Sequence, residues 1–149
     1  MHELLDDNSL NMSGYSIDEI FIGMKRSVSK TITEADLQAF AGITGDLNPV
    51  HMNAEYAKGT RFGERIAHGM LTASFFSTIV GMCIPGADAI YLSQNLEFLL
   101  PVKIGDTITA TGEVISRVPE KRIATLMMTA TNQQGQVVVK GEGKVMATK

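Results

Sequence analysis

Residues 46–51, with the sequence DLNPVH, place a carboxylate and an imidazole on either side of a turn. A carboxylate can take a proton from water, and an imidazole can hold, donate or take back a proton near neutral pH. Pro49 fixes one backbone angle and Asn48 can hydrogen-bond the local backbone, so the turn could hold Asp46 and His51 around one water molecule. The spacing leaves a second interpretation open, in which Asp46 and Asn48 only form the turn and His51 has no role.

A second pair of residues, His68 and Gly69, precedes a long apolar run. The first backbone N–H groups of a helix lack intrahelical partners and lie at the positive end of its dipole. Because glycine has no Cβ, a ligand oxygen could approach at Gly69 and find an oxyanion hole for a carbonyl that becomes enolate-like. The alternative, that Gly69 only permits close packing of the helix on a sheet, is equally open. We expect His68 to mark the start of the helix rather than to transfer protons.

Other chemical signatures are absent or weak in this sequence. We find no Ser–His–acid order, no metal-ligand spacing and no phosphate-binding glycine loop. Cys83 is expected in the core, because no nearby base is suggested that would activate its thiol. Two histidines and an aspartate could ligate a metal, but we expect neither a metal nor a cofactor.

Hydrophobic patterning indicates the elements that position these groups. We expect a strand over Phe21–Thr31, and then a helix that begins after the N-cap Thr33. The expected apolar stripe of that helix consists of Leu37, Phe40, Ala41 and Ile43. A short helix over Ala54–Ala57 follows the turn at residues 44–49. The segment Ile66–Cys83 is apolar around most of its circumference, which predicts a helix buried nearly all round.

The C-terminal half predicts four strands, at Ile90–Leu99, Asp106–Val118, Arg122–Asn132 and Gln136–Ala147. One long helix followed by an antiparallel meander indicates an α+β class, and the sheet must wrap around the helix to cover it. This is the geometry of a single hotdog fold. Such a sheet has open edges, so we expect a homodimer that continues the sheet.

The composition excludes several classes of protein. The 149 residues are 44% hydrophobic and 19% charged, as in an ordinary globular domain. The single cysteine rules out an intrachain disulfide and favours a reducing, cytoplasmic location. No stretch reaches the roughly 18 apolar residues of a membrane span. A net charge of −3 disfavours a nucleic-acid binder.

The charge is unevenly distributed along the chain. Residues 1–20 hold five acidic and no basic side chains, so the other 129 residues carry 13 basic and 11 acidic groups. Residues 1–16 lack periodicity and are expected to form an acidic, flexible tail, with the hotdog domain at 17–149. The slightly basic domain could offer Lys58, Arg61 or Arg65 to a polyanionic ligand, although the sequence assigns none of them.

The run Phe40–His51, with Ala57 beyond it, resembles the hydratase 2 motif of the (R)-specific enoyl-CoA hydratases in the MaoC-like family. The segment Ile66–Ser74 is also similar to that family, and Tyr91–Val102 with Gly105-Asp106 gives a weaker match. The resemblance extends from about Phe21 to the C-terminus.

This resemblance implies a homodimeric hotdog protein that reversibly hydrates trans-2-enoyl-CoA to (R)-3-hydroxyacyl-CoA. Asp46 would be the base on the attacking water, His51 would position that water and help deliver a proton to C2, and the Gly69 N–H would bind the thioester oxygen. Asn48 would support the loop, and Ser77 and Val80 would line the acyl pocket. Such hydratases serve polyhydroxyalkanoate synthesis or fatty-acid metabolism.

Two other classes of function are also consistent with the sequence. The first is a hotdog acyl-CoA thioesterase or a dehydratase acting on acyl carrier protein. The second is a non-catalytic acyl-CoA-binding module, for which the acidic tail could be a docking arm. The Asp–His spacing disfavours both the thioesterase and the binding module, because neither needs a water-holding pair on this loop.

Overall fold

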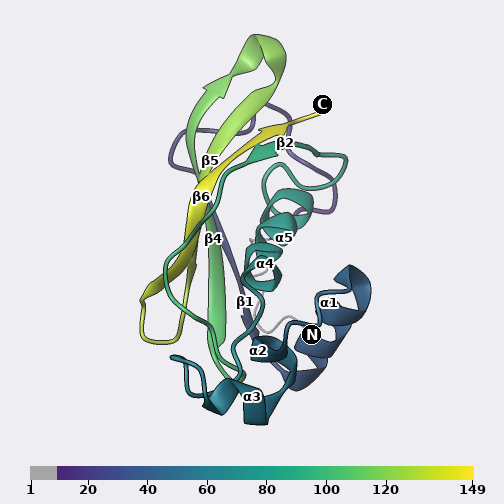
Figure 1. Cartoon of the computed structure of the whole chain (residues 1–149). Coiled ribbons are helices and arrows are strands. Elements are labelled where there is room, and N and C mark those ends of the chain that lie inside the picture. Colours follow the sequence, from purple (N-terminus) through teal and green to yellow (C-terminus); the bar gives the residue numbers. More distant parts are fainter. Residues whose placement is uncertain (1–9) are drawn as a thin grey trace.

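A computed structural model describes residues 10–149 as one antiparallel sheet with helices against it (Figure 1). The strands are β1 (Lys25–Thr31), β2 (Ile90–Gln94), β3 (Glu97–Phe98), β4 (Thr107–Val118), β5 (Ile123–Thr131) and β6 (Val137–Met146). They are ordered β1-β4-β5-β6-β2, with β3 also paired to β6, so β1 and β2 form the edges. The predicted α+β class and antiparallel sheet are confirmed.

The helices precede most of the sheet in the chain. They are α1 (Glu34–Thr44), α2 (Pro49–Met52), α3 (Ala54–Lys58), α4 (Gly69–Ala73) and α5 (Phe75–Met82), with a 3-10 turn at Pro119–Lys121. Thr33 caps α1 as predicted, and Asp36 completes a reciprocal capping box with it. Helix α2 was not predicted; Asn48 caps it and Pro49 occupies its first turn.

The central helix differs from the prediction in its start, its continuity and its burial. It begins at Gly69, because Ile66 and Ala67 are extended and pair with the segment before β4: Ile66 bridges Lys103, and the Ala67 N–H donates to the Val102 carbonyl. Ser74 separates α4 from α5. The prediction of burial nearly all round is wrong, because Met70, Ser74, Ser77 and Gly81 form an exposed stripe.

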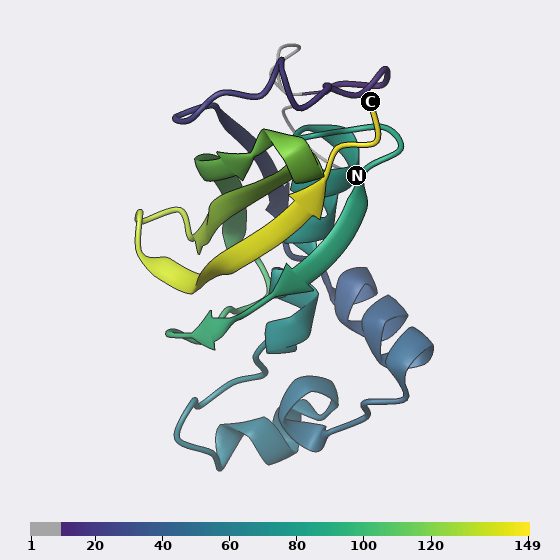
Figure 2. The same cartoon turned by 90° about the horizontal axis from the view of Figure 1, so that it is seen from above.

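The opposite face of α5 packs into the core against the concave side of the sheet, which Figure 2 shows from above. Helix α5 contacts β4 and β1. Phe76, Ile79 and Val80 belong to the same core cluster as the inward-facing residues of β4 and β5, whose burial alternates along each strand. Gly112 permits this close approach, because a Cβ there would lie 2.6 Å from the Ile79 Cγ2 atom. The sheet therefore covers the helix on one side only.

Three further predictions require correction. Residues 21–24 form a turn, so the first strand begins at Lys25. The expected strand Ile90–Leu99 divides into β2 and β3, with a register shift between Tyr91 and Ser93. Ile43 is 84% exposed and does not belong to the buried face of α1, which consists of Leu37 and Ala41, with Phe40 partly buried.

The described part of the predicted tail packs against the loop that follows α5. The Asn11 N–H donates to the Met82 carbonyl at 2.6 Å, and the Tyr15 N–H donates to the Pro85 carbonyl at 2.7 Å. Residues 1–9, which include His2 and three acidic side chains, lie outside the described residues. Within 10–149, none of the helices combines the length and the apolarity that crossing a membrane would demand.

Candidate active site

The loop that carries Asp46 is held by its own short polar side chains. Helix α1 ends at Gly45, whose φ of 77° is a left-handed conformation that glycine adopts readily. The Asp46 N–H donates to the Thr44 hydroxyl at 3.1 Å, and an Asp46 carboxylate oxygen accepts from the Asn48 N–H at 3.2 Å. The Asn48 side chain in turn caps α2 by accepting from the Val50 N–H. The loop is thus ordered while the Asp46 side chain stays exposed.

His51 lies on α2, and both its ring and its backbone are held by the extended segment before α4. Its Nδ1 lies 2.7 Å from the Ile66 carbonyl oxygen. Because a carbonyl can only accept, Nδ1 carries the hydrogen, and in the neutral ring Nε2 keeps its lone pair. Arg65 Nε donates to the His51 carbonyl oxygen at 2.5 Å.

Glu34 on α1 completes this contact network by pairing with Arg65. Its carboxylate lies 2.7 Å from an Arg65 guanidinium nitrogen. The hydrogen bond from Arg65 holds the pKa of Glu34 below its ordinary value. The ion pair therefore ties α1 to the segment that clamps His51.

His68 is a site residue whose role the sequence did not predict. It is 2% exposed, and its Nε2–H donates to the Asp46 backbone carbonyl at 3.0 Å. Its ring stacks on His51, with the ring centroids 4.0 Å apart and the planes at 30°, and its other neighbour is Phe40 at 4.9 Å. His68 does mark the start of α4, as predicted, but it also connects Asp46 to His51. The only sequence feature that could have indicated this role is the position of a histidine within an otherwise apolar run.

Asp46, His51 and His68 offer donor atoms within 4.8 Å of one another, which is close enough for a metal ion to be tested against their geometry. The lone pairs of an imidazole lie in the plane of its ring. The stacked rings of His51 and His68 therefore hold their lone pairs in two separate planes that are 30° apart, whereas two ligands of one ion must direct their lone pairs to a common point about 2 Å from each. The cluster therefore fits a water molecule with its protons better than a metal ion.

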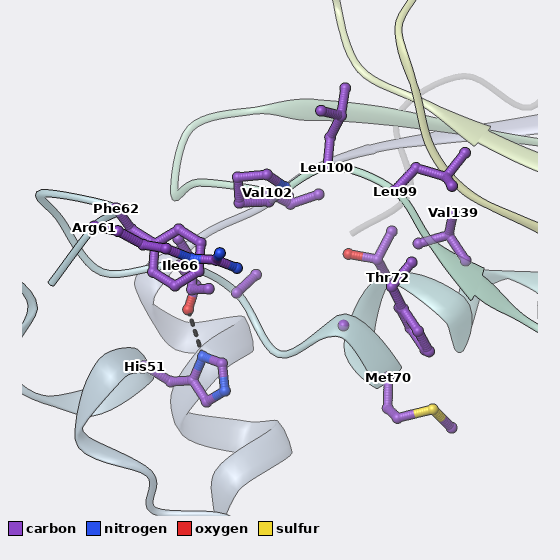
Figure 3. Close-up of a pocket in the computed structure, with 14 residues that line it drawn as sticks. His51, Arg61, Phe62, Ile66, Met70, Thr72, Leu99, Leu100, Val102 and Val139 are labelled. Carbon is purple, nitrogen blue, oxygen red and sulfur yellow. Dashed lines mark hydrogen bonds between the residues drawn. The ribbon is translucent and has the colours of Figure 1, made fainter.

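Gly69 begins α4 beside a cavity of about 460 Å³, shown in Figure 3. No described residue accepts a hydrogen bond from its backbone N–H. The Phe98 ring occupies the space where a side chain would stand, since a Cβ on Gly69 would lie 2.8 Å from Phe98 Cδ1. His51, Gly69, Met70, Arg61, Phe62 and Leu100 are among the residues that line the cavity. His51 and Gly69 thus line one cavity, and the Asp46 carboxylate lies close to His51 without lining the cavity.

The two residues expected to line the acyl pocket take different places. Ser77 lines a second hollow of about 440 Å³ between α5 and β2, together with Ser74, Tyr91 and Leu96. Val80 is 3% exposed, and it lines neither hollow. Met70 lines both hollows, so they meet at the start of α4.

Tyr91 gives the second hollow a polar end. Its hydroxyl donates to the Gln94 side-chain oxygen and lies 3.5 Å from the Met128 sulfur. Burial raises the pKa of Tyr91 to about 12, so the hydroxyl stays protonated. The sequence did not single out either Tyr91 or Gln94.

A curved antiparallel sheet around a central helix, with polar residues at the start of that helix, defines the hotdog class, as predicted. Within that class, the chain belongs to the MaoC-like family, because residues 21–138 match the family described as "MaoC like domain".

Several characterised relatives are similar over nearly their whole length. The chain is 49% identical over 129 residues to the (R)-specific enoyl-CoA hydratase of Rhodospirillum rubrum, covering 87% of this chain and 89% of the relative. It is 42% identical to the (R)-specific enoyl-CoA hydratase of Aeromonas caviae, covering 90% and 98%. The solved structure of the unliganded R-hydratase PhaJ1 from Pseudomonas aeruginosa superposes with a TM-score of 0.86 at 42% identity, covering 90% and 86%.

Proposed function

We propose that this protein reversibly hydrates trans-2-enoyl-CoA to (R)-3-hydroxyacyl-CoA, with Asp46 and His51 handling the water and Gly69 holding the thioester oxygen. One observation carries the proposal. The donor atoms of Asp46 and His51 lie within 4.8 Å of one another, and His51 lines the same cavity as Gly69, whose backbone N–H has no acceptor among the described residues. The names of the relatives in Rhodospirillum rubrum and Aeromonas caviae support the CoA thioester and the (R) product.

The attacking water must be deprotonated by a base and held in a fixed orientation. The tautomer of His51 supports a scheme in which His51 orients the water and Asp46 deprotonates it. With Nδ1–H committed to Ile66, Nε2 accepts a hydrogen bond from the water, while the Asp46 carboxylate takes the proton as oxygen attacks C3. The C3–O bond forms, and the electrons of the C2–C3 double bond move toward the thioester oxygen. A proton from the Asp46–His51 pair then reaches C2, which restores both groups.

The enolate-like intermediate needs a hydrogen-bond donor, and the Gly69 N–H supplies it. An added side chain would collide with Phe98, so a glycine keeps this approach open. Loss of one such donor typically costs about 10²–10³-fold in rate. Asn48 supports the arrangement by ordering the Asp46 loop and capping α2.

The two hollows support a direction for the substrate. The thioester sits where they meet, at Gly69 and Met70. The acyl chain follows the largely apolar hollow at Ser77 toward Tyr91, and the pantetheine arm follows the larger cavity. Val80, buried in the core behind Ser77, acts on the acyl end only through packing.

We also propose a homodimer that continues the sheet through β2. Ile90, Tyr91 and Leu92 are 47%, 37% and 44% exposed on an edge strand that offers unpaired backbone groups. The exposed helix stripe at Ser74, Ser77 and Gly81 runs alongside. Light scattering should give twice the chain mass of 16.1 kDa, and Leu92→Lys should lower it. A wild-type monomer would contradict this part.

The decisive test is the loss of crotonyl-CoA absorbance, followed by chiral analysis of the product. We expect (R)-3-hydroxybutyryl-CoA, with Asp46→Asn at least about 10²-fold slower because the base is gone. An inactive wild type against short, medium and long enoyl-CoAs refutes the proposal. Release of free thiol from saturated acyl-CoA would indicate a thioesterase, and acyl-CoA binding without turnover would indicate a binding module.

A further inference from the structure

We propose that Arg61 binds a phosphate group at or beyond the end of the pantetheine arm of the thioester substrate, an inference that rests on the proposed function. Three cationic residues, Lys58, Arg61 and Arg65, lie between the Phe40–His51 and Ile66–Ser74 segments, and the sequence alone does not indicate which of them binds a phosphate. Arg61 lines the cavity that contains His51 and Gly69, at the end occupied by Phe62. Figure 3 shows Arg61 and Phe62 together on one side of that cavity, with Met70 and Val139 on the other.

The contacts of the other two cations exclude them from this task. Lys58 lies 2.7 Å from the Glu55 carboxylate and outside the cavity lining. Arg65 is committed twice, to Glu34 at 2.7 Å and to the His51 carbonyl oxygen at 2.5 Å. Arg61 has no carboxylate within ion-pair distance anywhere in the described chain. Its guanidinium group is therefore available to an anionic ligand.

The two lysines that adjoin lining residues of the cavity also have acidic partners. Lys103, next to the lining residue Val102, pairs with Glu64 at 3.2 Å, and Lys140, next to Val139, pairs with Glu97 at 3.8 Å. None of the residues that line the cavity is acidic. Arg61 thus gives an otherwise largely apolar cavity one unpaired positive charge, which favours a ligand that is apolar along its length and anionic at its end.

Phe62 sets the position of that charge. The Arg61 guanidinium carbon lies 4.8 Å from the centre of the Phe62 ring, a cation–π contact that restricts the side chain. A planar guanidinium held in this way presents paired N–H donors to phosphate oxygens. A thioester carbonyl at Gly69 places the pantetheine arm in the same cavity, and the phosphates follow that arm.

Crotonyl thioesters of CoA, of 4'-phosphopantetheine and of pantetheine test this assignment. For crotonyl-CoA, we expect Arg61→Ala to raise KM about tenfold with kcat nearly unchanged, because a contact present in both ground and transition states is lost. Arg61→Lys should recover part of that loss. Lys58→Ala, which removes an equal charge nearby but outside the cavity, should leave KM unchanged. The pantetheine thioester, which has no phosphate, should not respond to Arg61→Ala.

The phosphopantetheine thioester locates the phosphate. A tenfold effect that persists with it places Arg61 on the phosphate nearest the pantetheine, and an effect confined to CoA places it on the nucleotide phosphates. No effect on crotonyl-CoA, or an equal effect on the pantetheine thioester, would overturn the assignment.

Calorimetric binding of butyryl-CoA, which cannot be hydrated, separates this inference from the proposed function. If the wild type binds butyryl-CoA more tightly than Arg61→Ala does but hydrates nothing, only the proposed function fails. If the wild type hydrates crotonyl-CoA and the two proteins bind butyryl-CoA equally, only the assignment of Arg61 fails.

Discussion

Replacing His68 with phenylalanine tests whether this residue positions Asp46 or takes part in the chemistry. The substitution keeps a ring of similar size between His51 and Phe40 but removes the N–H that holds the Asp46 carbonyl at 3.0 Å. It also removes the buried Nδ1 atom, which has no hydrogen-bond partner within residues 10–149. The perturbation therefore deletes one tether while it preserves the packing.

The expected magnitudes follow from these two changes. A hydrogen bond of this kind contributes about 1 kcal/mol net, so losing it lowers the equilibrium constant between the productive and displaced Asp46 loop about fivefold. The free energy of unfolding should change by less than about 1 kcal/mol, because a buried unpaired polar atom also costs free energy and is eliminated. We expect kcat for crotonyl-CoA to fall about fivefold, KM to stay within about twofold, and Tm to shift by no more than about 4 °C.

Steady-state kinetics and thermal unfolding of the same preparations provide the assay. His68→Ala is the matched comparison, since it leaves a cavity beside His51 and Phe40 and should destabilise by about 2–4 kcal/mol. Unchanged kcat in His68→Phe would show that the tether is irrelevant. A folded His68→Phe protein as inactive as Asp46→Asn would show that His68 itself transfers protons.

Three other predictions follow from single contacts. Gly69→Ala should lower kcat/KM more than tenfold, because its Cβ would lie 2.8 Å from the Phe98 ring, whereas Gly59→Ala, whose Cβ would meet only an ordinary 3.5 Å contact, should not. The lowered pKa of Glu34 means that its pair with Arg65 stabilises the fold above that pKa and is lost as the pH falls through it. Below about pH 5, the free energy of unfolding of the wild type should therefore fall slightly more steeply with decreasing pH than that of Glu34→Gln. Parallel plots of the free energy of unfolding against pH for the two proteins would contradict this. Burial raises the pKa of the Cys83 thiol to about 11, so the native protein should not react with iodoacetamide at pH 8, and rapid labelling would contradict this.

Local sequence determined the parts of the site that lie within one short segment. The Thr33 cap and the turn that carries Asp46 depend on neighbours within a few residues, so their chemistry is legible in the sequence. The contacts of His51 with Ile66 and of His68 with Asp46 span 15 and 22 residues. Such contacts depend on the tertiary fold that brings distant residues together, and hydrophobic periodicity in the sequence does not predict them.

The burial of the central helix was likewise only partly predictable from the sequence. The apolar count of the segment from 66 to 83 correctly predicted a central helix, but it could not show which side the sheet covers. Ser77 and Val80, only three residues apart, were grouped as pocket residues, yet one is exposed and the other lies in the core. The exposed stripe is the side that a single chain cannot cover.

The consecutive residues 65–69, which run from the extended segment into the first residue of α4, hold or supply every group that the proposed reaction needs. Arg65 holds the His51 backbone, Ile66 holds its ring, His68 holds the Asp46 loop, and Gly69 offers the free N–H. Between them, Ala67 anchors the segment by donating to the Val102 carbonyl. The proposed base, the imidazole and the proposed oxyanion donor are therefore fixed relative to one another by a single piece of backbone. Because misplacement by about 1 Å can cost about 10²-fold in rate, this shared support explains how Asp46 on a surface loop and His51 on α2 can serve a site at the start of the central helix.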